Sequence, residues 1–354
     1  MKKIIISIVA IVFLFFCGLI AFYVLNVNST FGKNEEVIVE IEKGSSSNKI
    51  AQKLEKSNLV SSWIFKLYCK FNKVDGMKAG TYKLNKSMKY SEIVENLKKG
   101  SKYNPDAISV KFLEGKNMRW IAKNIAQYTS NTEEQVYALL KDKNYLSSLS
   151  KKYWFIGSEV LNNQIYYSLE GYLFPDTYQF DNKNVSVEKI FEMMLDKMNI
   201  VLTKHRAQIE NLGLSVHSVL TLASIVELES SNVADKAGVA GVFFNRLAKN
   251  MSLGSDVTTY YAARVDMSER DLKMSEINAV NGYNTRAAGM EGKIPISPIS
   301  TVSESSIMAV LEPLKTTYLF FVADKNGKVY YANTNQEHEQ IIKTLKSQGL
   351  WYTY

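Results

Sequence analysis

An uncharged run near the N-terminus, from Ile4 to Leu25, limits what this chain can fold into more than any other feature. Its 22 residues would form a helix about 33 Å long, which is enough to cross the hydrocarbon core of a bilayer. The run is longer than the apolar region of a secretory signal, and no small-residue cleavage site follows it. We therefore expect an uncleaved transmembrane helix at residues 4–26.

Two positive charges, Lys2 and Lys3, come directly before this run. Positively charged flanks of membrane helices stay on the cytoplasmic side. We therefore expect a cytoplasmic tail at 1–3, a polar tether at 27–36, and an extracytoplasmic location for everything that follows. The protein would be a single-pass protein of the cell membrane.

Composition narrows the choice of function for the exterior part. The chain has 354 residues and a net charge of +8, from 43 Lys and Arg against 35 Asp and Glu. The basic residues are scattered among acidic ones without a stripe, so no nucleic-acid partner is expected, whereas an anionic cell wall or membrane surface suits a basic exterior. Cys17 lies in the apolar run, which leaves Cys69 alone outside and excludes an intramolecular disulfide there. No Cys/His cluster has zinc spacing, and no Gly-x-Ser-x-Gly elbow supports a serine nucleophile.

A short pattern occurs twice at a constant offset of 71 residues. Alternating apolar residues, a glycine and then helical spacing predict a strand, a turn and a helix in each copy. The two copies read Val39-x-Ile41-x-x-Gly44 with Ile50-Ala51-x-x-Leu54, and Val110-x-Phe112-x-x-Gly115 with Ile121-Ala122-x-x-Ile125. We interpret them as repeated strand–turn–helix elements, the first of them continued by a second strand near 79–84 and a helix near 91–97.

Apolar periodicity indicates an α+β exterior with a mainly helical C-terminal part. An aromatic segment broken by Gly171 and Pro175 is expected to be a loop. Two apolar runs around Asn326-Gly327 predict a β-hairpin. The expected helices lie at 117–152, 185–202, 216–230, 234–249 and 337–345.

Glu227 is the first charged residue after an uncharged run that begins at Leu220. The composition of this run predicts a helix in the core of the protein. On a helical wheel it lies beside an apolar arc and, on its other flank, beside Ser224, His217 and Thr221. This seam is where a cleft wall would lie, and partial desolvation there would raise the pKa of Glu227 and suit it to general acid catalysis. A salt-bridged carboxylate at a helix end is the alternative. Glu229 points to another side of the same helix.

Several further blocks surround this helix in a fixed order. They are Ser168-Leu-Glu-Gly-Tyr-Leu-Phe-Pro-Asp-Thr-Tyr178, Ala223-Ser-Ile-Val-Glu-Leu-Glu229, Ala240-Gly-Val-Phe-Phe-Asn-Arg-Leu247, Leu253-Gly-Ser-Asp-Val-Thr-Thr-Tyr260, Tyr283-Asn-Thr-Arg286, Pro295-Ile-Ser-Pro-Ile-Ser300 and Tyr318-Leu-Phe-Phe-Val-Ala-Asp324. Together they resemble the MltG (YceG-like) endolytic murein transglycosylases. The resemblance runs from the membrane segment to near the C-terminus.

This resemblance implies a domain organisation. It predicts a LysM-like module at 37–103, a second α/β module at 104–180 and a catalytic transglycosylase domain at 181–354. It also implies an enzyme that needs no cofactor and no metal. The expected partners are peptidoglycan glycan strands and the cell membrane, together with peptidoglycan synthases or proteins of the divisome or elongasome.

The same resemblance implies the reaction. A lytic transglycosylase cleaves the β-1,4 bond between N-acetylmuramic acid and N-acetylglucosamine with a single carboxylate, and the sugar's own C6 hydroxyl closes a 1,6-anhydro ring. Glu227 matches the family's catalytic glutamate, and Glu229 is the alternative, because a helical wheel does not separate the two. The remaining candidates are expected to bind substrate or support the site; they are Glu170, Asp256, Tyr283, Asn284 and Thr285.

One segment departs from the family pattern. Glu337-His338-Glu339 stands where Glu-His-Asn is usual, so His338 is expected to have a structural role. Two other functions stay open from the sequence. A muramidase would cut the same bond with water, and a non-catalytic scaffold would use the LysM-like part to bind the wall, although the intact Glu227 argues against a scaffold.

Overall fold

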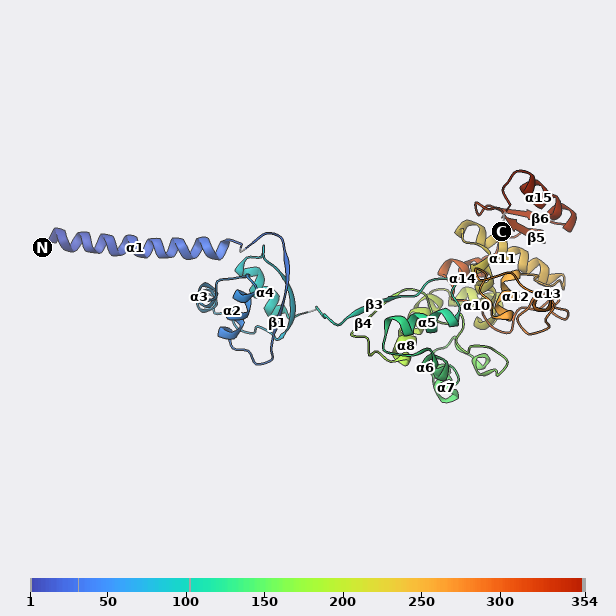
Figure 1. Cartoon of the computed structure of the whole chain (residues 1–354), viewed down its shortest axis with the longest axis horizontal. Helices are drawn as coiled ribbons and strands as arrows, with labels where there is room; N and C mark the ends of the chain where they lie inside the picture. The colour runs from blue at the N-terminus through green and yellow to red at the C-terminus, as the bar shows by residue number, and fades with distance from the viewer. Residues whose placement is uncertain (1, 31, 102, 352–354) are drawn as a thin grey trace. The chain divides into compact units, whose positions relative to one another are not determined.

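The chain forms two compact units, Met1–Ala107 and Ile108–Tyr354, each described here by itself (Figure 1). The computed structural model describes residues 2–30, 32–101 and 103–351. Within these residues the fold is α+β, with helices predominating over three small antiparallel strand pairs. The expected α+β class is therefore confirmed at this level, whereas the LysM-like identity of the first module stays a prediction.

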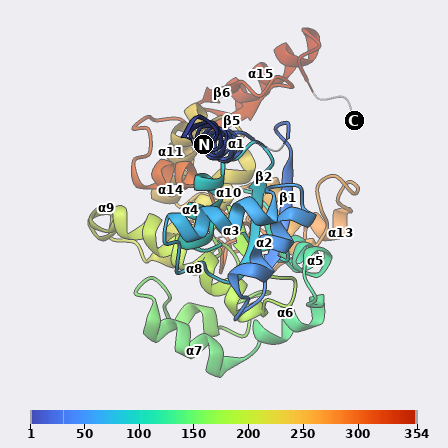
Figure 2. The ribbon, with the colours of Figure 1, turned by 90° about the vertical axis from the view of Figure 1, so that its left-hand side faces the viewer.

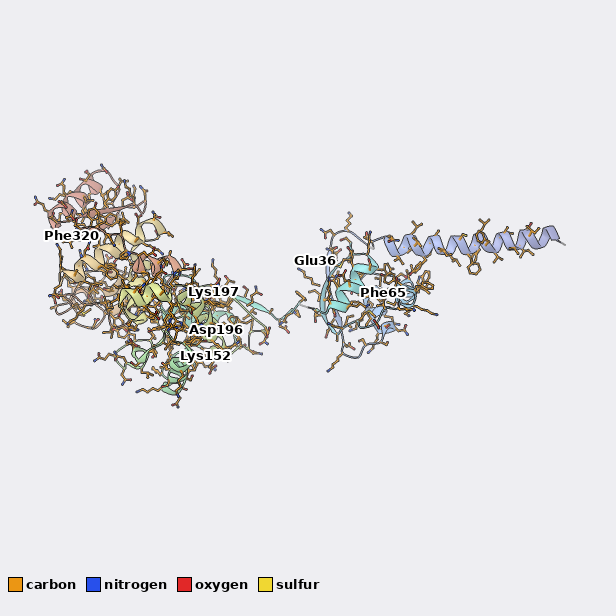
Figure 3. The ribbon with its side chains drawn as sticks, turned by 180° about the vertical axis from the view of Figure 1, so that it is seen from behind. Glu36, Phe65, Lys152, Asp196, Lys197 and Phe320 are labelled. Carbon is orange, nitrogen blue, oxygen red and sulfur yellow. The ribbon has the colours of Figure 1, made fainter. Side chains whose placement is uncertain are left out.

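The apolar N-terminal run forms one helix, α1 (Lys2–Asn28). Its segment Ile6–Asn28 has a mean hydropathy of 3.0 and is long enough to cross a bilayer. Figure 3 shows its side chains projecting away from the protein along most of its length. A helix that exposes this much apolar surface to water would be unfavourable, so the helix is a candidate membrane span, as the sequence predicts.

The remainder of the first unit is a strand pair covered by helices. Strand β1 (Glu36–Ile41) pairs antiparallel with β2 (Gly80–Asn85), so that the start of one faces the end of the other. Helices α2 (Ser47–Lys56), α3 (Ser62–Phe71) and α4 (Tyr90–Lys99) gather beside the strands (Figure 2). Alternate strand residues and the apolar stripes of the helices form one core, which includes Val39, Leu54, Phe65, Tyr82, Tyr90 and Leu97.

The predicted internal repeat is present at the level of local structure. In the second unit, β3 (Ile108–Lys111) leads into α5 (Met118–Tyr128), as β1 leads into α2. The turn glycines adopt the left-handed conformation in both copies, with φ of 79° at Gly44 and 67° at Gly115. The side chain of Ser46 caps α2, and Asn117, 71 residues later, caps α5. Matching turns and caps explain why the pattern recurs at a fixed offset.

Most of the second unit is helical. Strand β3 pairs with β4 (Thr177–Phe180), and β5 (Phe320–Ala323) pairs with β6 (Val329–Ala332). The other elements are α6 (Glu133–Leu139), α7 (Lys143–Lys152), the 3-10 helix η1 (Ser158–Leu161), α8 (Val187–Lys204), α9 (Arg206–Leu212), α10 (Val216–Glu229), α11 (Val233–Ala248), α12 (Asp256–Ala263), α13 (Met274–Ile277), α14 (Glu304–Leu311) and α15 (Asn335–Ser347).

A single core joins the parts of this unit that the sequence assigned to two domains. It runs from Val110 through Phe191 and Ala223 to Val310 without interruption. The predicted boundary at 180/181 stays a prediction, but residues on both sides of it pack together. The helical segment expected at 117–152 is three helices, and the loop expected around Gly171 ends in β4. Helices α12 and α14 are each only eight residues long, which is too short for sequence periodicity to indicate them.

Candidate active site

Helix α10 lies at the centre of the second unit and packs against α11, α12 and α14. Ser215 caps its first turn by accepting a hydrogen bond from the backbone N–H of Ser218. Every residue from Val219 to Val226 is buried. The helix can be buried this deeply because it carries no charge before its last turn, where Glu227 and Glu229 lie. Both candidate carboxylates therefore occupy the end at which α10 leaves the core.

The polar flank of α10 is covered by another segment of the chain, residues 296–303. The imidazole Nε2 of His217 lies 2.8 Å from the carbonyl oxygen of Ile296, and the backbone N–H of Ile299 donates to Ser224 Oγ at 3.0 Å. Upstream, Gly171 leaves room for this segment, since a Cβ there would lie 2.3 Å from Pro298 Cβ. The polar seam beside Glu227 is thus packed against this segment, and Ile299 of the segment also lines a cavity together with Leu228.

Glu227 is held in a closed network of donors. Its carboxylate accepts hydrogen bonds from Lys236 Nζ at 3.1 Å, from the backbone N–H of Ser303 at 3.0 Å and from Ser306 Oγ at 2.5 Å. The side chains of Glu227 and Lys236 are 8% and 4% exposed. Burial alone would raise the pKa of Glu227, but the hydroxyl, backbone and lysine partners outweigh it and hold the pKa below its ordinary value.

The expectation of a raised pKa at Glu227 is therefore wrong, although burial acts in the expected direction. Its physical reason is that a buried carboxylate surrounded by donors and a lysine is stabilised as an anion. The N-terminus of α14, which Ser303 caps, adds positive backbone dipoles near the same carboxylate. This environment matches the alternative of a salt-bridged carboxylate at the helix end, with Lys236 as its cation.

Glu229 has the opposite electrostatic environment. Its only hydrogen bond among the described contacts comes from Ser255 Oγ, at 2.5 Å from its Oε1. Burial raises the pKa of Glu229, and the neighbouring charge of Asp256 raises it further. The Ser255 hydrogen bond and the positive charges of Arg286 and Arg246 oppose the rise without cancelling it. A desolvated carboxyl with a raised pKa is the state that a general acid requires.

Charged residues of three further segments lie near Glu229. Asp256 begins α12 and accepts a hydrogen bond from Arg286 Nε at 2.5 Å, with both side chains well exposed. The Arg246 guanidinium donates to the backbone carbonyls of Leu319 at 2.6 Å and Leu253 at 2.7 Å. Arg246 is therefore fixed to the scaffold, whereas the Asp256–Arg286 pair faces solvent beside Glu229.

The Tyr-Asn-Thr block, Tyr283 to Thr285, packs against α12 inside the protein. Tyr283, Asn284 and Thr285 are at most 1% exposed. The amide of Asn284 accepts from Thr259 Oγ1 and donates to two backbone carbonyls, so its hydrogen-bonding capacity is used within the protein. Thr285 Oγ1 accepts from the backbone N–H of Ser255 at 3.0 Å, which positions the serine that contacts Glu229. The block thus has contacts with the scaffold rather than an open face for sugar.

Glu170 is fully buried under the same helix. Its Oε2 accepts hydrogen bonds from the backbone N–H of Met118 at 2.9 Å and from the Tyr261 hydroxyl at 3.0 Å. Its Oε1 has no hydrogen-bond partner in the described part of the chain. Burial raises the pKa of Glu170 to about 7, against the lowering effect of its hydrogen bonds and of Arg119. Glu170 therefore joins the start of α5 to α12 behind the cleft wall.

A cavity of about 410 Å³ opens between the end of α10, helix α12 and the turn before α5. Its lining combines aromatic and aliphatic side chains with polar ones, among them Lys116, Asn117 and Asp266, a mixture that suits the faces and hydroxyls of sugar rings. A second cavity of about 560 Å³ lies beyond Tyr166, whose ring stacks on that of Tyr261 at 5.8 Å. The first cavity is lined by residues that include Gly115, Trp120, Leu228, Tyr260, Tyr261 and Ile299.

The site offers acid–base chemistry. In the residues that the structure describes, no three His, Cys, Asp or Glu side chains gather in a way that could hold a metal ion. His338 lies with its Nε2 at 3.2 Å from the carbonyl oxygen of Phe321, and burial lowers its pKa. This position in the β5–α15 contact agrees with the structural role expected from the sequence.

Comparison with known proteins places this geometry in a family. A family model described as the YceG-like family matches residues 39–344. The chain belongs to the YceG-like family. The resemblance that the sequence blocks indicated is thereby confirmed, and it extends through both units of the protein.

Named relatives and a solved structure agree with this membership. The chain is similar to a Bacillus subtilis protein named endolytic murein transglycosylase, at 36% identity over 306 residues, which cover 86% of this chain and 83% of the relative. A Streptococcus pneumoniae protein of the same name is 32% identical over 86% of this chain and 58% of its own length. The crystal structure of a YceG-like protein from Listeria monocytogenes matches with a TM-score of 0.62 and 34% identity, over 87% of this chain and 100% of that one.

Several residues of the site were not singled out from the sequence. Ser255, Arg246 and Arg286 lie inside the blocks that carry the family resemblance, so their positions were visible but their contact with Glu229 was not. Lys236 lies outside those blocks, and a lysine in a helix is ordinarily exposed. Its burial against Glu227 depends on the packing of α10, α11 and α14, which periodicity does not reveal.

Proposed function

We propose that this protein is a membrane-anchored endolytic murein transglycosylase that cleaves the bond between N-acetylmuramic acid and N-acetylglucosamine in nascent peptidoglycan. Membership of the YceG-like family and the names of two relatives support the reaction class. The aromatic cavity next to the end of α10 supports a saccharide substrate. The observation that carries the proposal is the position of the two glutamates at the end of α10, where Leu228, which stands between them in the sequence, lines this cavity.

We assign the acid–base role to Glu229 in preference to Glu227. Both glutamates end α10, but Lys236 and two serines lower the pKa of Glu227, whereas burial and the charge of Asp256 raise the pKa of Glu229. A general acid must hold its proton until the leaving oxygen takes it, and a raised pKa favours this role for Glu229 over Glu227. Glu227 then holds α11 and α14 against α10 and so positions the end of the helix.

The proposed reaction uses Glu229 twice. Its carboxyl proton passes to the glycosidic oxygen as the bond from that oxygen to C1 of N-acetylmuramic acid breaks, which leaves a hydroxyl on N-acetylglucosamine. Positive charge develops at C1, and the Glu229 carboxylate lies ready to stabilise it. The C6 hydroxyl oxygen then bonds to C1, and its proton returns to Glu229. No water is consumed, and the product carries a 1,6-anhydro ring.

The neighbours of Glu229 have distinct proposed roles in this cycle. Ser255 orients the carboxyl through its 2.5 Å hydrogen bond, and the Thr285 contact fixes Ser255. The negative charge of Asp256 helps Glu229 to keep its proton, while Arg286 moderates that effect. Glu170 and the Tyr283–Thr285 block support α12 and with it the cavity wall.

A muramidase is the second candidate function, because Asp256 gives the site a second carboxylate. A hydrolase would use such a group to activate water, and the product would have a reducing end in place of the anhydro ring. Mass spectrometry of peptidoglycan digested by the purified protein separates the two reactions. We expect 1,6-anhydro-muropeptides, and reducing N-acetylmuramic acid ends as the sole product would overturn the transglycosylase assignment. Absence of any cleavage would favour the scaffold alternative.

The cellular setting follows from α1. We propose that it anchors the protein in the cell membrane with its N-terminus in the cytoplasm, since Lys2 and Lys3 precede it. Both units would then meet newly made glycan strands outside the membrane, where cleavage ends chain growth and where peptidoglycan synthases or divisome or elongasome proteins are available as partners. Protease added to intact spheroplasts should degrade the exterior part, and protection of that part would contradict this orientation.

A further inference from the structure

The end of α1 packs directly onto helix α3 of the first unit. The ring of Phe22 stacks on that of Trp63 with centroids 6.0 Å apart and planes 8° from parallel. Tyr23 meets Phe71 edge to face at 5.5 Å. Tyr23 and Val27 also contact the core of the first unit. The membrane helix is therefore attached to this unit by side-chain packing as well as by the chain.

Two residues between α1 and β1, Gly32 and Glu35, also contact Lys86, just after β2. The backbone N–H of Gly32 donates to the carbonyl oxygen of Lys86 at 3.1 Å, and Lys86 Nζ lies 2.8 Å from Glu35 Oε1. Only seven residues separate Asn28, the end of α1, from Glu36, the start of β1. A fully extended segment of that length spans about 25 Å, so the first unit stays close to the end of the helix.

The surface of α3 beside this contact is apolar and aromatic. Trp63 is 52% and Phe71 66% exposed although each already contacts α1. Lys70 is exposed next to Phe71, and the opposite face of α3 places Ile64, Phe65 and Cys69 in the unit's core. Protein surfaces that lie in the headgroup region of a bilayer typically expose tryptophan and phenylalanine next to lysine.

The contacts with α1 fix how deep the exposed face of α3 lies relative to the membrane. The apolar run of α1 ends at Leu25, so Phe22 and Tyr23 occupy its last turn before the polar side chains begin. If α1 spans the membrane, this turn lies at the outer interface, where aromatic residues are favoured. Trp63 and Phe71 contact that turn and must lie at a similar depth.

We infer that α3 is a membrane-surface helix, and that its exposed face, formed by Trp63 and Phe71 with Lys70, inserts into the headgroup region of the outer leaflet. The partner is lipid, not a further protein, because the surface is continuous with the apolar surface of α1. The inference rests on the proposed anchoring by α1. The first unit is then held against the membrane instead of acting as a free spacer.

Tryptophan quenching by brominated lipids tests this directly in the full-length protein. The protein is reconstituted in nanodiscs of phosphatidylcholine and phosphatidylglycerol, with and without bromine on the acyl chains near the headgroup. Trp63→Phe keeps an aromatic contact with Phe22 but removes the fluorophore. Trp154→Phe removes a partly exposed tryptophan of the second unit and shows the effect of losing one fluorophore. A fluorophore on Cys17, which lies within α1 and is exposed, reports the anchor itself.

We expect brominated lipid to quench the Cys17 label strongly and to quench part of the wild-type tryptophan emission. Trp63→Phe should abolish most of that quenched component, whereas Trp154→Phe should leave it in place. A quenched Cys17 label together with an equal quenched component in wild type and Trp63→Phe would overturn the membrane-surface role of α3 and leave the anchor intact. An unquenched Cys17 label would overturn the anchor and this inference together.

Discussion

Glu170 should make the stability of the second unit fall as pH rises from about 4.5 to 7. Burial raises the pKa of Glu170 from 4.5 to about 7. A carboxyl whose pKa is raised on folding favours the folded state while it is protonated, below its unfolded pKa, and that contribution is lost as pH rises through the folded pKa. A rise of this size corresponds to about 3 kcal/mol.

Glu170→Gln isolates this contribution. The glutamine oxygen can still accept from Met118 and Tyr261, but the side chain no longer ionises. Urea unfolding of wild type and variant at pH 5 and pH 8 gives the difference in free energy of unfolding at each pH. We expect this difference to shift in favour of the variant by about 2.5 kcal/mol between the two values, since part of the full effect already occurs below pH 5. Glu291→Gln, which removes an exposed carboxylate, controls for the change in net charge.

The reasoning would be refuted by a difference between wild type and Glu170→Gln that does not change with pH. That result would mean that Glu170 ionises as readily in the folded protein as in the unfolded chain, so that its buried position imposes no penalty on the charge. A shift of equal size in Glu291→Gln would assign the effect to net charge and not to burial.

Two further predictions concern buried groups outside the acid–base centre. Lys236→Met should lower the free energy of unfolding, measured in urea, by about 3 to 5 kcal/mol because it leaves the Glu227 carboxylate buried without its cation. The double variant Lys236→Met with Glu227→Gln should recover most of this loss. Equal stability of wild type and Lys236→Met would contradict a buried ion pair between Lys236 and Glu227. Cys69 should react slowly with maleimide at pH 7 in the native protein and quickly in urea, since burial raises the pKa of its thiol to about 11. Cys69→Ala should cost about 1 kcal/mol, and rapid native labelling or collapse of the variant would argue against a buried free thiol.

Local patterns in the sequence predicted local structure well. The offset of 71 residues identified paired strand–turn–helix elements because a turn glycine with positive φ and a capping side chain are requirements that two copies share. Helix α10 was recognisable because a run without charge can be buried whole. The short helices α12 and α14 gave too few turns for periodicity, and their positions depend on the segments that pack around them.

The candidate site shows where such reasoning ends. The sequence located both glutamates on one helix end and left them as alternatives. It could not separate them because their pKa values depend on donors from distant segments, above all Lys236 and Ser303 for Glu227 and Ser255 for Glu229. The wheel position of Glu227 indicated a polar neighbour correctly, but that neighbour is the packed segment 296–303 and not solvent.

Comparison of Glu229→Gln with Glu227→Gln tests the central assignment most directly. Both variants keep the shape of the side chain and remove its proton chemistry. Release of 1,6-anhydro-muropeptides from purified peptidoglycan is measured by mass spectrometry, with folding checked by circular dichroism. Because Glu227→Gln leaves Lys236 unpaired, Glu227→Gln with Lys236→Met serves as a second variant that removes both buried charges.

We predict that Glu229→Gln folds as wild type does, binds glycan and releases no anhydro product. Either Glu227 variant that folds should keep measurable activity. The activity of that variant should decline at high pH, as the activity of wild type does, because Glu229 loses its acidic proton as the pH rises through its raised pKa. An active Glu229→Gln enzyme, together with inactive but folded Glu227 variants, would contradict the account and return the catalytic role to Glu227.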